Sequence, residues 1–283
     1  MLQDSPDSHA AASPTVSVII PVYNMADFIE AAITSVVEGY YDDLEVIVVN
    51  DGSTDETEQV VRQFLNPGSD RYDERVHYLS QPNQGKPAAV NRGMEAMSGT
   101  YLALLDADDK LPPDSLTRRV DALRENPSAD MVIGGFEVVG GSSTGTLGKR
   151  SSPSFLDPKR LKHAFCLSYR TPFHFNACLL DCSLVERVGL FDSQLNRCQD
   201  IDYSIRCMEE TCGVVRVDAP VYFYRKHRSS TWNRISIRLA TARHRPYVVL
   251  KNFAPPRSYF YVVVTALLDT SKLLYELASN YTS

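Results

Sequence analysis

The sequence predicts an α/β fold, with a mostly parallel central sheet, helices on both faces of the sheet and a helical C-terminal tail. Over the first hundred residues, short β-branched runs alternate with amphipathic stretches, as in repeated strand–helix–strand units. Polar residues gather directly after the strand runs, where ligands of parallel sheets bind. The 283 residues are 43% hydrophobic and 23% charged, which fits a folded domain and excludes a fibre or a multi-span membrane protein.

The first half has a regular order of elements. Runs of β-branched and aliphatic residues predict buried strands at 16–21, 44–50, 76–80 and 101–105. Apolar residues at helical spacing predict helices between them, at 25–37, 55–64 and 87–97. Ser53, followed three residues later by Glu56, is a capping-box pattern and predicts the start of the second helix. Repeated units of this kind give parallel strands with helices on both faces of one sheet.

The second half, from Leu111, is less regular. We expect a helix from Pro112-Pro113 to about Arg124, a strand at 131–139, a turn or mobile loop at 140–148, a helix at 200–210 and a strand at 214–224. The polar residues 1–14 are expected to be a disordered leader. No linker separates the halves, so 15–109 and 110–232 are predicted to be parts of one domain, and 233–283 a helical extension.

The charge of the chain is unevenly distributed. With 29 Lys and Arg against 35 Asp and Glu, the net charge is −6, which argues against a dedicated nucleic-acid binder. Nine cations lie late in the chain with no Asp or Glu among them: Arg225, Lys226, Arg228, Arg234, Arg238, Arg243, Arg245, Lys251 and Arg257. Removing them from the total leaves −15 for the rest. Residues 234–278 are expected to contact an anionic membrane surface, an acidic acceptor or a second subunit, or to pack as a helix on the acidic body.

The N-terminus and the cysteines bear on the compartment. Residues 1–14 have no apolar core of a targeting signal, which predicts a cytoplasmic protein, or one held peripherally at the cytoplasmic face of a membrane. All six cysteines lie in the second half. Because the chain shows no secretion signal, we expect reduced thiols, and the spacing of the cysteines does not fit a structural zinc site.

Two carboxylates follow the fourth predicted strand. Asp106 and Asp108 come directly after the apolar run 101–105, and the alternation of an extended chain points them the same way. Mg²⁺ prefers oxygen ligands and binds one or two carboxylates together with phosphate and water. The pattern therefore indicates a metal that holds a diphosphate or, with equal weight, an Asp-rich turn that caps the next helix. The first two strands also end in polar residues, Tyr23-Asn24 and Asp51-Gly52-Ser53.

Four segments resemble, in order and at similar spacing, the motifs of the family 2 inverting glycosyltransferases: Val16-Ser-Val-Ile-Ile-Pro-Val-Tyr-Asn24, Asn50-Asp-Gly-Ser-Thr-Asp55, Asn83-Gln-Gly-Lys-Pro-Ala-Ala-Val-Asn-Arg-Gly93 and Leu104-Leu-Asp-Ala-Asp-Asp109. The similarity continues through Val188-Gly-Leu-Phe-Asp192 and Asp200-Ile-Asp-Tyr-Ser-Ile-Arg206. It implies the GT-A fold with its Rossmann-like sheet, and transfer of a sugar from a nucleotide diphosphate sugar to an acceptor hydroxyl. Residues 15–109 would bind the nucleotide sugar and 110–232 the acceptor.

The resemblance implies roles for the first-half motifs. The implied nucleotide-binding residues are Pro21, Val22, Tyr23, Asn24, Asp51, Gly85, Lys86, Asn91, Arg92, Asp106 and Ala107. The Asp51 carboxylate would accept a hydrogen bond from a ring N–H, which suits uracil and favours a UDP-sugar. Lys86 and Arg92 would reach the diphosphate or the sugar, unless they are solvated helix cations. Asp108 would ligate Mn²⁺ or Mg²⁺, with Asp106 on the ribose or a metal-bound water and Asp109 bracing the loop.

The implied base lies in the second half. In this family it is the Asp of a Glu-Asp pair at the start of a helix, and this sequence has Gln199-Asp200 instead. Asp200 is therefore the expected catalytic base and Asp202 the runner-up, the alternative being an N-cap and a surface residue. His227 would meet the metal or the diphosphate, unless it is structural, and the residues that would close over the diphosphate are Arg225, Arg228 and Ser230.

Processive synthases of this family carry a Gln-x-x-Arg-Trp motif and several membrane spans, and here Thr231 precedes Trp232. We therefore expect a non-processive hexosyl- or N-acetylhexosaminyltransferase of glycan or polysaccharide biosynthesis, acting on a glycan, lipid-linked or other hydroxyl acceptor. A sugar would dock near Tyr169, Arg170, His174 and Asn176. The alternative is a non-catalytic nucleotide-sugar or carbohydrate-binding module that has lost its base, which Gln199 supports. A sugar nucleotidyltransferase is disfavoured, because the first strand lacks a Gly-rich loop.

Overall fold

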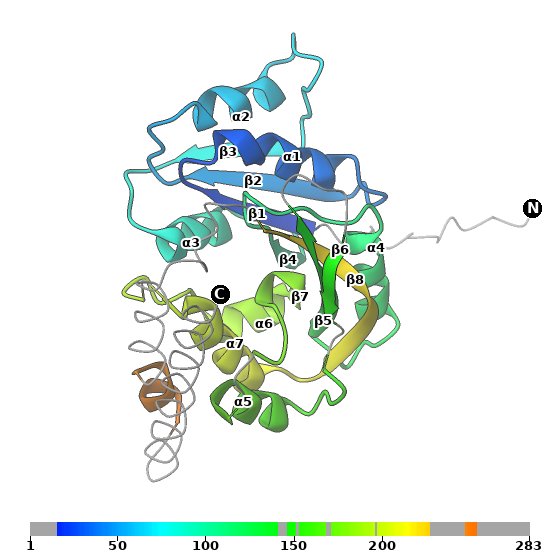
Figure 1. The fold of residues 1–283 in the computed structure, drawn as a ribbon. Coiled ribbons are helices and arrows are strands. Elements are labelled where there is room, and N and C mark those ends of the chain that lie inside the picture. Colours follow the sequence, from blue (N-terminus) through cyan, green and yellow to red (C-terminus); the bar gives the residue numbers. More distant parts are fainter. Residues whose placement is uncertain are drawn as a thin grey trace, which may run out of the picture.

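The computed structural model describes residues 16–140, 146–150, 153–167, 171–195, 197–226 and 247–253. They form one eight-stranded sheet in the order β3-β2-β1-β4-β7-β5-β6, with β8 paired to β5 (Figure 1). The strands β3, β2, β1 and β4 are mutually parallel. Beyond them β7 is antiparallel to both β4 and β5, and β6 is antiparallel to β5. The mixed α/β fold with its mostly parallel sheet is as predicted from the sequence.

The elements of the first half confirm the predicted order. The strands are β1 (Val16–Val22), β2 (Leu44–Asn50), β3 (Val76–Ser80) and β4 (Tyr101–Leu104), and the helices are α1 (Ala26–Val37), α2 (Thr57–Leu65) and α3 (Lys86–Ala96). The predicted cap of α2 is wrong. Asp55 Oδ1 accepts from the Thr57 N–H at 3.0 Å, and the Ser53 hydroxyl accepts instead from the Asn24 N–H at 2.9 Å. Because Ser53 bridges the ends of β1 and β2, α2 begins later than the capping-box pattern predicts.

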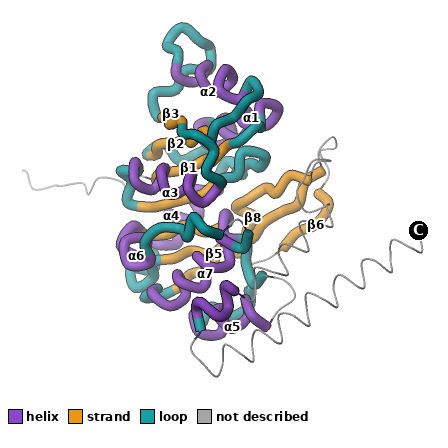
Figure 2. The backbone as a smooth tube through the Cα atoms, turned by 90° about the vertical axis from the view of Figure 1, so that its left-hand side faces the viewer, coloured by secondary structure: helices purple, strands orange, loops and turns teal. Residues whose placement is uncertain are grey.

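The second half adds elements of both kinds. The helices are α4 (Ser115–Arg124), α5 (Pro158–Leu167), α6 (Cys182–Val188) and α7 (Gln199–Glu210), with a 3₁₀ turn η1 at Phe175–Ala177. The strands are β5 (Met131–Gly140), β6 (Thr146–Arg150), β7 (Cys178–Asp181) and β8 (Val214–Lys226). The expectation of a loop over 140–148 is therefore wrong at its end, because β6 pairs with β5 as the edge strand of the sheet. In Figure 2, β6 and β8 extend away from the rest of the sheet.

Two apolar cores lie on opposite faces of the sheet. One contains the buried side chains of α1, α2 and α4, and the other those of α3, α5, α6 and α7. Val16, Val18, Ile20 and Val22 of β1 enter one core and Ile19 enters the other, so both faces of this strand are buried. Helix α3 packs especially close, since a Cβ added at Gly93 would lie 2.5 Å from Cγ2 of Ile19. The first residue of α3, Lys86, is thereby held over the carboxyl ends of the parallel strands.

Part of the C-terminal extension docks on the second core. Residues 247–252 are helical, and Val248, Val249 and Phe253 are buried beside α5 and α7. For this segment the prediction of a helix packed on the acidic body is confirmed. The predicted leader at 1–14 lies outside the described residues, as does most of the 234–278 segment expected to meet a membrane or a second subunit. Among the helices that the structure describes, each is too short or too polar to span a bilayer. The described cysteines are thiols: Cys178, Cys182, Cys198, Cys207 and Cys212.

Candidate active site

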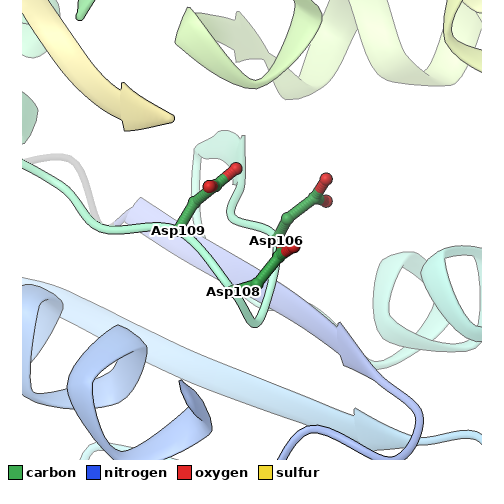
Figure 3. Close-up of side chains that lie close together, drawn as sticks. All are labelled: Asp106, Asp108 and Asp109. Atoms are coloured by element: carbon green, nitrogen blue, oxygen red, sulfur yellow. The ribbon is translucent and has the colours of Figure 1, made fainter. Parts of the chain in front are cut away.

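Three carboxylates gather in the short loop that follows β4. One ligand oxygen from each of Asp106, Asp108 and Asp109 lies within 4.8 Å of the others, and Figure 3 shows the three side chains on a single loop. Asp109 is fully buried. Its burial, and then the charges of Asp106 and Asp108, raise its pKa to about 8. Carboxylates at this separation repel one another, and a divalent cation among them would relieve that repulsion. The donor set therefore fits the Mg²⁺ or Mn²⁺ that the sequence predicts.

A buried tyrosine forms hydrogen bonds that support this loop. The Tyr222 hydroxyl, on β8, donates to Asp109 Oδ2 at 2.5 Å and accepts from Asn176 Nδ2 at 3.1 Å. The other Asp109 oxygen accepts from the Arg225 N–H at 2.7 Å. Asp109 thus braces the loop from within, as predicted, whereas Asp106 and Asp108 remain partly exposed. Sequence reasoning missed Tyr222, because its contacts with Asp109 and Asn176 join residues 113 and 46 positions apart.

The first residue of α3 faces the carboxylates. Lys86 Nζ lies 2.5 Å from Asp106 Oδ1, and both side chains are partly exposed, at 41% and 27%. Burial alone would lower the pKa of Lys86, but the charge and hydrogen bond of Asp106 outweigh it, so this pKa is raised. Asp200 and Asp108 add to the increase, which places both carboxylates in the electrostatic range of the ammonium. The structure therefore brings together Lys86, the start of α7 and the loop that carries Asp106, Asp108 and Asp109, called here the aspartate loop.

The two candidate bases have opposite environments. Asp200, in the first turn of α7, is exposed. Asp202 is completely buried, and its carboxylate accepts from Arg206 Nε at 3.0 Å and from Asn252 Nδ2 at 2.9 Å. Lys251 Nζ lies 3.2 Å from the same carboxylate. Since Asp202 is enclosed by these partners, it is Asp200 that an acceptor hydroxyl can approach.

Side-chain hydrogen bonds join the ends of β1 and β2. The Thr54 N–H donates to Asn24 Oδ1 at 2.7 Å, and Asn24 has a positive φ of 52°. Asp51 is buried and accepts from Gln81 Nε2 at 2.8 Å and from the N–H groups of Gln84 and Gly85 at 2.9 and 2.8 Å. Gly85 has a φ of 91°, which favours glycine at this turn into α3. A carboxylate has about four acceptor positions, and these hydrogen bonds use three of them on Asp51.

Other first-half residues named from the sequence lie in different surroundings. Pro21, Val22 and Ala107 are buried, so they shape the strand ends, whereas Tyr23 is 46% exposed beside them. Asn91 uses its amide on the backbone of Phe191. Arg92 lines a separate groove of about 640 Å³, whose lining includes neither Lys86 nor the aspartates.

Of the second-half site residues predicted from the sequence, some lie among the described residues and others do not. His174 stacks on Tyr222 with the ring centroids 5.1 Å apart. Burial alone would raise the pKa of Asp106, but Lys86 and, to a smaller extent, His174 and Asn176 outweigh burial and lower it. The guanidinium of Arg225 lies over the Phe28 ring, 5.3 Å from its centroid. His227, Arg228, Ser230, Tyr169 and Arg170 lie outside the described residues, so their roles stay predictions.

Comparisons with known proteins agree with this geometry. The family model described as "Glycosyl transferase family 2" matches residues 17–188. An uncharacterized glycosyltransferase of Rickettsia prowazekii is 31% identical over 191 residues, which cover 67% of this chain and 57% of that protein. TuaG of Bacillus subtilis, a candidate teichuronic acid biosynthesis glycosyltransferase, is 38% identical over 118 residues, which cover 41% of this chain and 44% of that protein.

Solved structures share the fold. S. aureus TarS in complex with UDP-GlcNAc superposes with a TM-score of 0.65 at 17% identity, covering 88% of this chain and 70% of that one. The mannosyltransferase PcManGT of Pyrobaculum calidifontis, in complex with GDP-Man and Mn²⁺, gives a TM-score of 0.62 at 21% identity, covering 96% and 76%. The fold is therefore the GT-A fold. The chain spans less than two thirds of the length of the curated relatives it matches. Since the family model covers more than half of the sequence, the chain belongs to glycosyl transferase family 2.

Proposed function

We propose that the chain is a metal-dependent, inverting and non-processive glycosyltransferase that moves a hexosyl or N-acetylhexosaminyl group from a UDP-sugar to an acceptor hydroxyl. The observation that carries the proposal is the meeting of three groups at one sheet edge. Lys86 contacts Asp106, the aspartate loop holds three clustered carboxylates, and the exposed Asp200 lies within electrostatic range of Lys86. These are a cation, a metal-ligand set and a carboxylate base.

Each group has a distinct task in the transfer. Lys86 would neutralise the negative charge that develops on the leaving diphosphate. A divalent cation bound by Asp106 and Asp108 would supply Lewis-acid stabilisation to the same oxygens. Inversion needs a base on the side of the sugar opposite to the diphosphate, so Asp200, on the α7 side of the aspartate loop, would accept the proton of the acceptor hydroxyl.

The comparisons support the donor and the metal. TarS was solved with UDP-GlcNAc, and PcManGT with GDP-Man and Mn²⁺, so related folds hold nucleotide sugars and one holds a divalent cation. The Asp51 carboxylate can accept a hydrogen bond from the ring N–H of uracil, which supports UDP as the nucleotide. TuaG supports a place in polysaccharide biosynthesis. For the location, we propose the cytoplasm or the cytoplasmic face of a membrane.

The first experiment is a thermal-shift panel of UDP-, GDP- and dTDP-sugars with and without Mn²⁺. We expect stabilisation by UDP-sugars, larger with Mn²⁺, because a ligand that binds only the folded state raises the melting temperature. The best ligand is then tested for release of UDP with and without simple sugar acceptors. Stabilisation by GDP- or dTDP-sugars alone would contradict the uracil assignment, and the same stabilisation in EDTA would contradict metal dependence.

A non-catalytic binding module is the second candidate, and Gln199 favours it, because the family's Glu is missing beside Asp200. The same panel separates the two functions. A module would bind the UDP-sugar yet release no UDP, and Asp200→Asn would change nothing.

A further inference from the structure

The turn at 188–192, between α6 and α7, is held by α3 from one side. Asn91 Nδ2 donates to the Phe191 carbonyl at 2.8 Å, and Asn91 Oδ1 accepts from the Phe191 N–H, also at 2.8 Å. The two residues are a hundred positions apart in the chain. Because a single amide side chain holds both backbone groups of Phe191, it fixes the turn in position and in orientation.

The same turn is held by α7 from the other side. Arg206 donates from Nη1 to the Val188 carbonyl at 2.7 Å and from Nη2 to the Leu190 carbonyl at 2.9 Å. The Phe191 ring stacks on Tyr203, with the centroids 3.9 Å apart and the planes at 4°. Tyr203 is fully buried. Since Arg206 and Tyr203 both belong to α7, the turn and the helix form one packed unit.

These contacts connect the two sides of the active site. Helix α3 begins at Lys86, which contacts Asp106, and carries Asn91 just over one turn later. Helix α7 begins at Gln199-Asp200 and carries Tyr203 one turn later. The Asn91–Phe191 contact therefore connects α3, which carries Lys86, to the turn packed on α7, which carries the exposed Asp200.

We propose that Asn91 is a positioning residue, which by holding Phe191 sets the place of Asp200 relative to Lys86 and the aspartate loop. This inference rests on the glycosyl transfer proposed above. A displacement of about 1 Å in a catalytic group can cost on the order of 10²-fold in rate. The residues proposed to bind the nucleotide lie at the ends of β1 and β2 and at the start of α3, outside the 188–192 turn. Loss of the link therefore lowers kcat and spares nucleotide binding.

The test compares Asn91→Ala and Phe191→Leu with Thr211→Val. The control removes a threonine hydroxyl that bonds Asp130 and the Gly213 carbonyl at the far end of α7, away from the active site. The donor is the UDP-sugar that the wild type turns over fastest. We expect kcat for UDP release to fall about tenfold to a hundredfold in Asn91→Ala and Phe191→Leu. The Kd of UDP in the presence of Mn²⁺ should change by less than about twofold in both variants. Hydrogen exchange should speed up at 199–203 in both variants and stay unchanged there in Thr211→Val.

Three results would overturn the positioning role. The first is a loss of UDP affinity in Asn91→Ala with kcat kept at saturating donor, which would make Asn91 a nucleotide-binding residue. The second is normal kcat in a folded Asn91→Ala chain, and the third is unchanged exchange at 199–203. If Asn91→Ala does not fold, Phe191→Leu tests the other half of the link, because it keeps the Asn91 bonds to the backbone and removes the ring contacts with Tyr203 and Phe175. A wild type that releases no UDP would instead refute the proposed function, and the exchange measurement, which needs no donor, would still test the link.

Discussion

The Lys86 ammonium lies 2.5 Å from Oδ1 of Asp106, and this contact joins the start of α3 to the end of β4. The pair holds a cation over the aspartate loop before any ligand enters. A diphosphate that binds here competes with Asp106 for Lys86, while a divalent cation competes with Lys86 for Asp106. Donor and metal are therefore expected to strengthen each other's binding, because each satisfies the group that the other displaces.

Replacing the exposed carboxylate of α7 tests the base. We expect Asp200→Asn to cut turnover by roughly 10² or more while UDP binding persists, because the amide cannot accept the proton of the acceptor hydroxyl. Steady-state kinetics and calorimetry with UDP measure the two effects. Asp70→Asn, at an exposed carboxylate beyond α2, is the matched control. Near-normal turnover in Asp200→Asn would show that another group is the base.

Replacing Asp108 tests the metal site. Asp108→Ala should abolish the part of UDP affinity that depends on Mn²⁺, because it removes one of the three clustered carboxylates. Calorimetry with UDP, in Mn²⁺ and in EDTA, measures this part in the wild type and the variant. Asp114→Asn, an acid that pairs with Arg118 at the start of α4, serves as the control. UDP affinity that neither EDTA nor the variant changes would refute the assignment.

Replacing Asp202 affects stability first. Asp202→Ala leaves Arg206 and Lys251 without their buried carboxylate. We expect the free energy of unfolding to fall by about 3 kcal/mol. This is the low end of the range for a broken buried ion pair, because both cations keep some access to water. Urea titration measures the change. Asp200→Asn should stay within about 0.5 kcal/mol of the wild type, as surface substitutions do. Equal stabilities of the two variants would contradict the burial of Asp202.

A methyl group at Gly93 tests the close approach of α3 to β1. The added Cβ of Gly93→Ala would lie 2.5 Å from Ile19 Cγ2, so we expect a loss of about 1–3 kcal/mol in the free energy of unfolding, despite alanine's better helix propensity. Thermal and urea unfolding provide the measurement. Glu95→Ala, at an exposed position of the same helix, is the control. A more stable Gly93→Ala chain would show that this packing has room.

Glu45 should contribute to acid stability. Burial alone would raise its pKa, but hydrogen bonds from Ser17, Ser98 and Gly99 outweigh burial and lower it. A carboxylate whose pKa is lower in the folded state stabilises the protein above its unfolded pKa of about 4.3, and this contribution is lost as the pH falls through the folded pKa. Between pH 7 and pH 3, urea unfolding of Glu45→Gln should therefore lose less stability than that of the wild type. Parallel pH curves would contradict this expectation.

The sequence predicts most of the first half because its signals are local. β2 and β3 match the predicted bounds, and the polar residues after β1, β2 and β4 do meet at one edge. β6 was not predicted, because this short edge strand, Thr-Leu-Gly-Lys-Arg, is defined by its pairing with β5 rather than by an apolar pattern of its own. Helix α5 was also missed, although Asp157-Pro158 is a helix-start signal: Asp157 Oδ1 accepts from the Arg160 N–H at 2.8 Å.

The candidate site is only partly readable from the sequence. Motif spacing pointed to Lys86, the aspartates and Asp200, with Asp202 as the runner-up. It could not show that Asp202 is buried, because that burial comes from Lys251 and Asn252 far along the chain. The roles of Tyr222 and of the Asn91–Phe191 contact could not be predicted either, because each depends on residues far apart in the chain.

The bond between Asp202 and the 247–253 segment has a consequence for engineering. Acceptor specificity in such enzymes is an attractive target for chimeras that exchange the second half for that of a relative. Here α7 and the helical segment after it share one buried charge network through Asp202, Lys251 and Asn252. A graft that ends at β8 would place a foreign helix against the native 247–253 segment and separate Lys251 and Asn252 from the Asp202 carboxylate that they contact. The natural unit of exchange therefore extends through residue 253.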